Sequence, residues 1–329
     1  MQRKPRYRAW LLGMLVLLPG LLASPAAAQD HFFDSDGVRL RYLVEGEGEP
    51  VVLLHGLVGN VYLQWKLPGI MTALAQDYQV IALDQRAHGR SGSPRDPAEY
   101  GVEMVEDVVR LLDHLKIERA HVVGYSMGGF IAAKLVTVHP DRLLTATLGG
   151  AGWSKADDVR ADFMGELAES LDRGQGIRPL LVRLTPPGRR LPSEERLRFI
   201  TRLMNWTHDT KSLAALVRGM DQLCIEEEQL RANHVPTLAI VGESDPLKIT
   251  VDELVGVMSN LETVVLAGAD HMDAFAQPEF VHSLKSFLAR HALAAVEGDQ
   301  AEMDKHRTAE VPAPSKSGST QRPAGSVGR

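Results

Sequence analysis

Val-Val-Gly-Tyr-Ser-Met-Gly-Gly-Phe, at positions 122–130, is the stretch from which the fold of this chain can be worked out. The residues before Ser126 are apolar and β-branched, as in a buried strand, and residues 130–136 are good helix formers. Gly124 and Gly128 flank the serine where a Cβ would collide with the neighbouring chain in a sharp turn. A flexible loop is the alternative, but the strand before and the helix after indicate a turn that presents a nucleophilic serine.

This turn also predicts where negative charge could be stabilised. It would aim the Ser126 hydroxyl away from the sheet and place the Met127 backbone N–H at the start of a helix. An N–H in that position can donate to the oxygen of a carbonyl under attack. We expect the second donor in the loop after the apolar run 50–54, and we assign it to the backbone N–H of Leu57.

Short apolar runs recur along the chain and alternate with segments of helical periodicity. Runs without polar positions are typical of parallel strands buried on both faces, and this rhythm indicates a doubly wound parallel sheet of the α/β class. Residues 38–44 alternate apolar and polar, which predicts an antiparallel edge strand with one solvated face. The predicted buried strands are 50–54, 79–83, 121–123, 143–148, 237–241 and 263–266, and the predicted helices are 65–75, 104–115 and 278–292.

Residues 152–233 break this rhythm. They are rich in helix formers and charge, with scattered Met, Leu, Phe and Trp, which predicts a helical cap inserted after the sixth strand. Such a cap would lie over the carboxyl ends of the strands and shape a substrate pocket. We therefore divide the folded part into a first core segment at 29–151, the cap, and a second core segment at 234–295.

The two ends of the chain differ from the rest. Residues 1–28 combine a basic start, an apolar run at 9–23 and Ala26-Ala27-Ala28, as in a signal peptide. An uncleaved membrane anchor is the alternative, but the apolar run is short and contains a proline and a glycine. We expect export to the periplasm or outside a bacterial cell. Residues 296–329 are rich in Pro, Ser, Gly and mixed charge, which predicts a disordered tail.

Charge and composition exclude several function classes. The net charge of −6 becomes −10 once the four cations of residues 1–28 are removed, which argues against a nucleic-acid partner. Cys224 is the single cysteine, so no intrachain disulfide can form. No glycine-rich phosphate loop follows a strand, and no His or Cys cluster has the spacing of metal ligands. We expect a small-molecule substrate, no cofactor and no metal.

A nucleophilic serine needs a base and an acid that orients the base. Asp245 follows a predicted strand and precedes Pro246, where the chain must turn. Glu243 is an alternative acid, and a helix cap is an alternative role for Asp245. His271 lies between the last predicted strand and the last helix, and we assign it as the base, although a loop histidine can also be merely solvated. The chain order serine, acid, histidine supports these assignments.

Three further residues are candidates for contact with a substrate. Trp153 and Phe275 are plausible lining residues, against ordinary core packing as the alternative. His55 precedes the serine in the chain, so we assign it to substrate contact or to orientation of the 55–59 loop and not to the base.

The residues His55-Gly56, Asp84-Gln85-Arg86-Ala87-His88-Gly89-Arg90-Ser91, Gly124-Tyr125-Ser126-Met127-Gly128-Gly129, Asp245 and His271 together resemble the α/β-hydrolase superfamily, in its esterase, lipase and C–C hydrolase branch. The resemblance covers roughly residues 38–291. It implies an eight-stranded, mostly parallel sheet. It also implies that Ser126 attacks a carbonyl, His271 takes and returns the proton, Asp245 orients His271, and an acyl-enzyme forms.

Two departures within this resemblance are informative. Ala87 stands where relatives usually carry glycine, in a loop that is mainly structural in the family, so we expect little effect on the chemistry. Serine at the turn disfavours haloalkane dehalogenases and epoxide hydrolases, which use aspartate there. The resulting hypothesis is an exported carboxylesterase-like enzyme for an ester, lactone or thioester. A C–C bond hydrolase, a cofactor-free perhydrolase and a non-catalytic ligand-binding relative remain alternatives.

Overall fold

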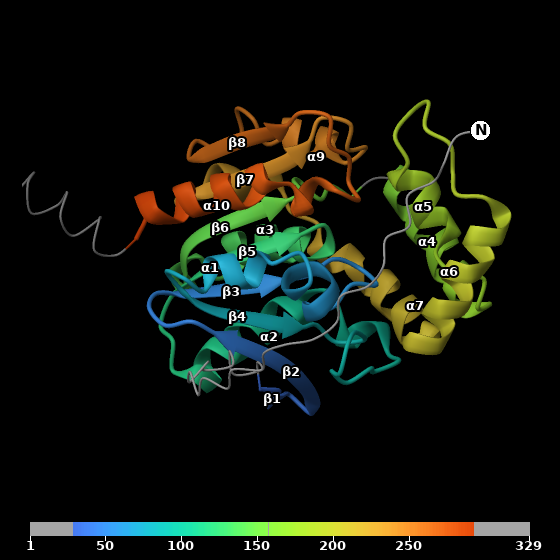
Figure 1. Cartoon of the computed structure of the whole chain (residues 1–329), viewed down its shortest axis with the longest axis horizontal. Coiled ribbons are helices and arrows are strands. Elements are labelled where there is room, and N and C mark those ends of the chain that lie inside the picture. The colour runs from blue at the N-terminus through green and yellow to red at the C-terminus, as the bar shows by residue number, and fades with distance from the viewer. Residues whose placement is uncertain (1–28, 157, 293–329) are drawn as a thin grey trace, which may run out of the picture.

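One eight-stranded sheet organises the fold, and the computed structural model describes residues 29–156 and 158–292. The spatial order of the strands is β1-β2-β4-β3-β5-β6-β7-β8 (Figure 1). The strand β2 runs antiparallel to both neighbours, and all other pairs are parallel. This arrangement confirms the predicted doubly wound, mostly parallel sheet. The strands are β1 (His31–Ser35), β2 (Val38–Glu45), β3 (Pro50–Leu54), β4 (Gln79–Asp84), β5 (Ala120–Tyr125), β6 (Leu143–Gly149), β7 (Thr237–Gly242) and β8 (Leu261–Leu266).

Helices cover both faces of the sheet and create two hydrophobic cores. Alternate side chains of a strand point to opposite faces, so Val122 packs with α2 (Val102–Leu115) and α3 (Met127–Val138), whereas Val123 packs with α1 (Ile70–Leu74) and α10 (Pro278–Arg290). The central strand β5 is buried along its whole length. The nucleophile candidate therefore follows a strand that is enclosed along its whole length.

The strand predicted at 38–44 is present as β2, but the prediction that it lies at the edge of the sheet is wrong. The strand β1 pairs with the outer side of β2, so β2 is an internal strand. Arg41, which the alternating pattern assigns to a solvated face, is only 1% exposed because Asp84 and Asp30 satisfy its guanidinium group. A buried ion pair cannot be distinguished from a solvent-facing cation by hydrophobic periodicity alone.

The helix predicted at 65–75 is divided into two short pieces. A π-helical turn covers Tyr62–Lys66, and α1 begins only at Ile70. Gly69 separates them with φ at +82°, a left-handed conformation that glycine adopts without steric cost. The composition of the segment is helical, but Pro68 and Gly69 interrupt it.

A group of helices separates β6 from β7 and lies beside the carboxyl ends of the strands (Figure 1). Its members are α4 (Asp158–Asp172), α5 (Arg178–Leu184), α6 (Glu194–Thr207) and α7 (Thr210–Gly219). The short helix α8 (Glu227–Arg231) then leads back to the start of β7 and lies near the end of α3. Two ion pairs connect this helical segment to the rest of the fold. Arg95 pairs with Asp209 at 2.7 Å, and Arg189 pairs with Asp270 at 2.6 Å. The boundaries of the cap as a separate domain stay a prediction.

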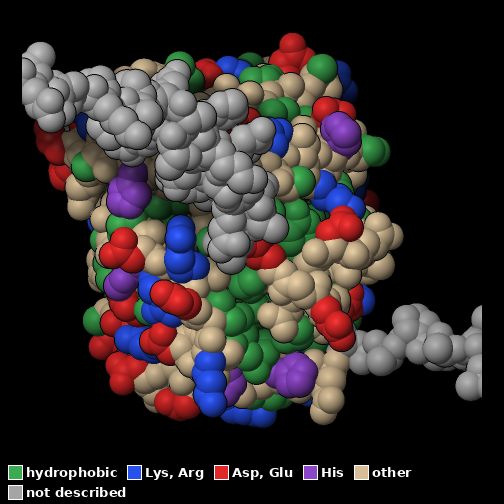
Figure 2. All heavy atoms as spheres, turned by 90° about the vertical axis from the view of Figure 1, so that its left-hand side faces the viewer, with side chains coloured by type: hydrophobic (Ala, Val, Ile, Leu, Met, Phe, Trp, Pro, Cys, Tyr) green, Lys and Arg blue, Asp and Glu red, His purple; other side chains and the backbone are tan. Residues whose placement is uncertain are grey.

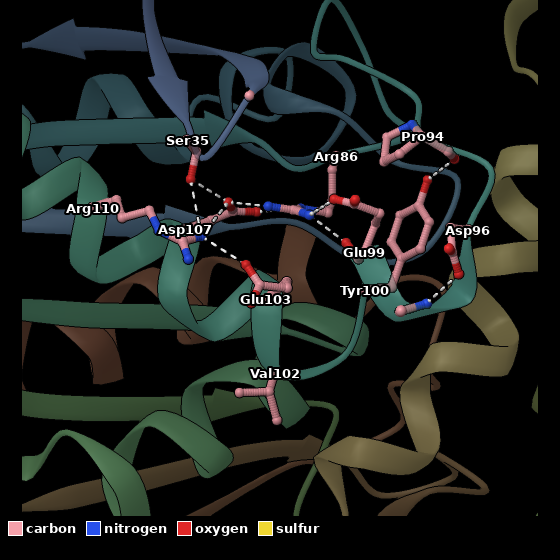
Figure 3. Close-up of polar contacts among 12 residues, drawn as sticks. Ser35, Arg86, Pro94, Asp96, Glu99, Tyr100, Val102, Glu103, Asp107 and Arg110 are labelled. Carbon is pink, nitrogen blue, oxygen red and sulfur yellow. Dashed lines mark hydrogen bonds and ion pairs between the residues drawn. The ribbon is translucent and has the colours of Figure 1, made fainter.

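A buried polar network connects α2 to the loop that follows β4 (Figure 3). Arg86 donates two hydrogen bonds to Asp107, at 2.5 and 2.7 Å, and each residue is about 1% exposed or less. Ser35 of β1 donates to the same carboxylate at 2.6 Å. Because a buried charge requires a partner, these contacts fix the loop that carries Gln85 and His88 relative to the sheet.

The outer surface at the amino ends of the strands has charges of both signs interspersed, as Figure 2 shows for the left-hand side of Figure 1. Within 29–156 and 158–292, every helix is too short or too polar to cross a bilayer. The predicted signal peptide at 1–28 and the predicted tail at 296–329 lie outside the described residues.

Candidate active site

Ser126 occupies a strained turn between β5 and α3. Its backbone has φ 54° and ψ −117°, a conformation that L-residues rarely adopt. A Cβ on Gly124 would lie 2.0 Å from the carbonyl oxygen of Gly128, and a Cβ on Gly128 would lie 2.2 Å from that of Leu54. The two flanking glycines are therefore required by close backbone approach, as the sequence predicts.

The structure brings the three predicted catalytic residues together. Nε2 of His271 lies 3.0 Å from Oγ of Ser126, and Nδ1 of His271 lies 2.8 Å from Oδ2 of Asp245. The imidazole is 4% exposed, so both hydrogen bonds are sheltered from water. With a proton on Nδ1, the imidazole donates to the carboxylate and its Nε2 can accept the serine proton. This geometry can generate an oxygen nucleophile.

Neighbouring groups hold the acid and the base in place. Oδ1 of Asp245 accepts a hydrogen bond from the Leu247 N–H at 2.8 Å, which leaves Oδ2 directed at His271. The hydroxyl of Tyr125 donates to the His271 carbonyl oxygen at 2.7 Å. The alternative acid, Glu243, is exposed and accepts from the Gly268 N–H, so it is directed away from the imidazole.

Both predicted oxyanion donors lie at the serine. Leu57 and Met127 line the same cavity as Ser126, and a Cβ on Gly56 would lie 3.2 Å from that of Ser126. Neither the Leu57 nor the Met127 backbone N–H donates a hydrogen bond to another described residue. Two free N–H groups beside a nucleophile are what a developing oxyanion requires.

The loop that carries Leu57 depends on residues that the sequence reasoning did not single out. His88 accepts a hydrogen bond from the Val58 N–H at 3.0 Å through Nε2 and contacts the Arg86 carbonyl oxygen at 3.0 Å through Nδ1. Val58 has φ at +56°, which is unfavourable for a β-branched residue. Burial lowers the pKa of His88 well below its usual value, so the neutral ring remains an acceptor.

His55 anchors the same loop and does not contact the cavity. It is fully buried, its Nδ1 contacts the Gly56 carbonyl oxygen at 2.8 Å, and its Nε2 accepts from the Gln85 N–H at 3.1 Å. Burial lowers the pKa of His55, which keeps the ring neutral. The predicted substrate contact for His55 is therefore wrong, whereas its alternative assignment, orientation of the loop, fits these bonds. In the sequence, the feature that could have identified Gln85 and His88 as supports of this loop is their position in the 84–91 segment.

A cavity of about 310 Å³ opens beside Ser126. Trp153 lines it as predicted, and its Nε1 donates to the Ile225 carbonyl oxygen at 2.8 Å. Phe275 does not line the cavity. It packs edge-on against Tyr125, with 5.2 Å between ring centroids, because it belongs to the hydrophobic core between the sheet and the helices α1 and α10. The other apolar lining residues are Phe130, Phe163, Met164, Leu167, Leu180, Leu184, Met220, Leu247 and Ile249.

Four charged residues also line this cavity and were not predicted. They are Lys155, Arg160, Arg183 and Glu253. Lys155 pairs with Glu253 at 3.2 Å and lies 4.1 Å from the centre of the Trp153 ring. Lys155, Arg160 and Arg183 belong to the predicted cap, and Glu253 belongs to the second core segment. In sequence, each looks like any solvated charged residue, so no pattern identified this group. In the described ranges, no group of His, Cys, Asp and Glu has the arrangement of a metal site.

Comparison with known proteins gives a consistent assignment. Residues 49–278 match a family model described as the alpha/beta hydrolase fold. The chain is 31% identical over 272 residues to the dihydrolipoyllysine-residue acetyltransferase component of an acetoin cleaving system from Cupriavidus necator, covering 81% of this chain and 70% of that protein. It is also 31% identical over 227 residues to a 2-hydroxymuconate semialdehyde hydrolase from Pseudomonas sp. strain CF600, covering 64% of this chain and 75% of that protein.

The solved structures agree at the level of the fold. An alpha/beta hydrolase enzyme from a Medee basin deep-sea metagenome library superposes with a TM-score of 0.69 at 18% sequence identity. The superposition covers 80% of this chain and 98% of the other.

Proposed function

The chain belongs to the alpha/beta hydrolase fold family, and from this premise we propose that it is an exported serine hydrolase that cleaves a carboxylic ester, a lactone or a thioester. The observation that carries the proposal is the continuous hydrogen-bonded series from Ser126 Oγ through His271 to Asp245. Coupling of a serine to a buried imidazole and carboxylate supports nucleophilic catalysis at a carbonyl.

In the proposed reaction, Ser126 Oγ attacks the substrate carbonyl carbon while His271 Nε2 accepts the hydroxyl proton. The carbonyl oxygen becomes an oxyanion that accepts from the N–H groups of Leu57 and Met127. Collapse of this intermediate breaks the bond to the alcohol or thiol, which leaves with the proton from His271. Water then attacks the acyl-enzyme, with His271 again as base, and releases the acid and free Ser126.

The cavity supports an apolar acyl or alcohol group. Its lining is mostly Leu, Met, Phe and Trp side chains, which favour apolar ligands. Each buried methylene contributes about 0.8 kcal/mol, or up to about fourfold in kcat/KM, until the cavity is filled. We expect p-nitrophenyl esters to be hydrolysed with increasing kcat/KM from acetate toward medium acyl chains, and Ser126→Ala to abolish this turnover.

Cleavage of a C–C bond is a second candidate, because the Pseudomonas relative is named as a semialdehyde hydrolase. The expected signal peptide argues against it, since breakdown of aromatic rings normally takes place in the cytoplasm. An absorbance assay with a 2-hydroxy-6-oxo-dienoate would distinguish the two. Turnover of the dienoate but not of the ester panel would replace the ester proposal. Failure of a fluorophosphonate to label Ser126, with no turnover of either substrate, would refute both.

A further inference from the structure

The helix α6 has apolar side chains on both its inner and its outer face. Leu197 and Met204 are buried against the rest of the fold. Phe199, Leu203 and Trp206 are 65%, 48% and 83% exposed. These three residues have the spacing i, i+4 and i+7, so they lie along one side of the helix, and we call them the α6 stripe. Three large apolar side chains in a row on a solvent-exposed helix face indicate a binding surface.

Arginine residues border the α6 stripe on both sides. With 3.6 residues per turn, Arg198 and Arg202 follow one edge of the stripe and Arg196 follows the other. Across the described residues, none of these three guanidinium groups has an ion-pair partner. Of the two acids in the first turn, Glu194 pairs with Arg178 at 2.6 Å. Glu195, four residues before Phe199, lies on the same face but is outnumbered by the three arginines, so this face is locally cationic although the whole chain carries a net charge of −6.

We propose that α6 docks the protein on the surface of an anionic phospholipid bilayer. A helix that lies in a membrane interface combines large apolar residues on one line with Arg or Lys on either side. Tryptophan is favoured at that depth because its ring is apolar and its N–H is polar. The arginines would contact lipid phosphates while the α6 stripe enters the boundary of the acyl chains. The net negative charge of the rest of the molecule favours the orientation with α6 toward the lipid.

A second copy of the chain is a poorer occupant of this face. Twofold contact would bring two α6 stripes together and, with them, six arginines against only Glu195 of each chain. Like charges next to each other in an interface disfavour association. An anionic lipid surface, in contrast, supplies the opposite charge at every arginine.

Trp206 provides a direct test. Trp65 and Trp153 are buried, and the remaining tryptophan, Trp10, lies in the expected signal peptide. In the full chain with Trp10→Phe, we expect vesicles of phosphatidylglycerol and phosphatidylcholine to shift the emission to shorter wavelength. Brominated acyl chains should quench it, whereas phosphatidylcholine alone should have a weak effect. Binding through residues 9–23 would not quench Trp206.

Variants on the same chain separate α6 from other surfaces. We expect Phe199→Ser with Leu203→Ser to weaken partition into these vesicles by about tenfold or more. Arg198→Gln and Arg202→Gln should each weaken it by about fivefold at low salt. Val138→Ser is the matched control, because Val138 is an exposed apolar residue at the last position of α3 and is not part of α6. All variants should hydrolyse a soluble ester normally.

Specific outcomes would overturn the proposal. Absence of quenching of Trp206 by brominated anionic lipid, or equal partition of the stripe variants and Val138→Ser, would exclude α6 as the docking surface. The emission of Trp206 is the part that is lost on Trp206→Phe, because Trp65 and Trp153 are buried. If that part is typical of a buried indole before vesicles are added and is unchanged afterwards, the face is already covered. Sedimentation velocity would then tell whether a second copy or a segment of the same chain covers it.

Discussion

At the scale of single residues, the site combines strain with directed hydrogen bonds. Ser126 and Val58 both have positive φ, and each is held by contacts from elsewhere in the fold. Strain of about 1–3 kcal/mol at such positions persists only where the surroundings enforce it. The flanking glycines allow the close backbone approach at Ser126, whose N–H donates to the Gly149 carbonyl oxygen at 2.7 Å, and His88 holds the loop at Val58. Both strained residues are next to a proposed oxyanion donor, so the strain positions these N–H groups before substrate binds.

The acid is tested by a matched pair of variants. Asp245→Ala removes the acceptor at 2.8 Å from His271 Nδ1, so the imidazole loses its orientation and the stabilisation of its charged form. We expect kcat to fall by about 10³-fold or more, with a smaller change in KM. Glu243→Ala, in which the carboxylate removed is directed at Gly268, should keep nearly full activity. The opposite ranking in steady-state ester hydrolysis would reassign the acid.

His88 is predicted to control turnover without contact with the substrate. His88→Leu removes the acceptor of the Val58 N–H, which leaves an unfavourable φ unsupported and allows Leu57 to move. Since loss of an oxyanion donor costs about 10²–10³ in kcat, we expect a decrease of about 10–100-fold from displacing one. His88→Gln, with an acceptor oxygen, should recover part of it. Partly exposed His139 provides the control His139→Leu, and equal kcat for both leucine variants would contradict this role.

At the scale of elements, replacing a glycine by alanine is expected to have opposite effects on stability in two helices. Gly165 lies within α4, and a Cβ there would meet no atom within 4 Å. We expect Gly165→Ala to raise the free energy of unfolding by about 0.5–1 kcal/mol, because alanine favours the helix. Gly128→Ala in α3 would place a Cβ 2.2 Å from the Leu54 carbonyl oxygen and should destabilise the fold strongly. Chemical denaturation of both variants tests the pair, and a stabilising Gly128→Ala would refute the packing argument.

The elements also show what could be predicted from the sequence. The central strands and the order serine, acid, histidine follow from local patterns, because buried parallel strands are apolar throughout and each catalytic residue comes just after a strand. The strand β1 was missed, since its short run His31–Ser35 is mixed in polarity. The alternating pattern wrongly places Arg41 on a solvated face, because its ion-pair partners, Asp30 and Asp84, are distant in the sequence. The cavity charges Arg160 and Arg183 depend on how α4 and α5 pack, and the pair Lys155–Glu253 joins two distant segments, which no local pattern records.

At the scale of the whole molecule, four histidines make stability depend on pH. Burial lowers the pKa of His55, His88, His121 and His208 below the ordinary value of 6.5. Well above pH 6.5 these rings are neutral in both the folded and the unfolded states. As the pH falls below 6.5, these histidines become protonated in the unfolded chain but remain neutral in the folded protein. The free energy of unfolding must therefore decrease as the pH falls from 6.5 toward the folded-state pKa values.

The slope of that decrease tests the argument. Each such histidine contributes up to about 1.4 kcal/mol per pH unit within this window. Carboxylates also titrate at lower pH, so a comparison between variants is needed to isolate the histidines. His121 of β5 is fully buried, its Nδ1 contacts the Thr145 hydroxyl at 2.8 Å, and its Nε2 lies 3.3 Å from Glu49, although burial is the larger influence on its pKa. Denaturation of the wild type and of His121→Gln between pH 7.5 and 5 should show a shallower decrease in the variant. If the free energy of unfolding decreases equally in the wild type and in the variant, His121 is protonated equally in the folded and unfolded states. That result would contradict the prediction that its burial lowers stability at low pH.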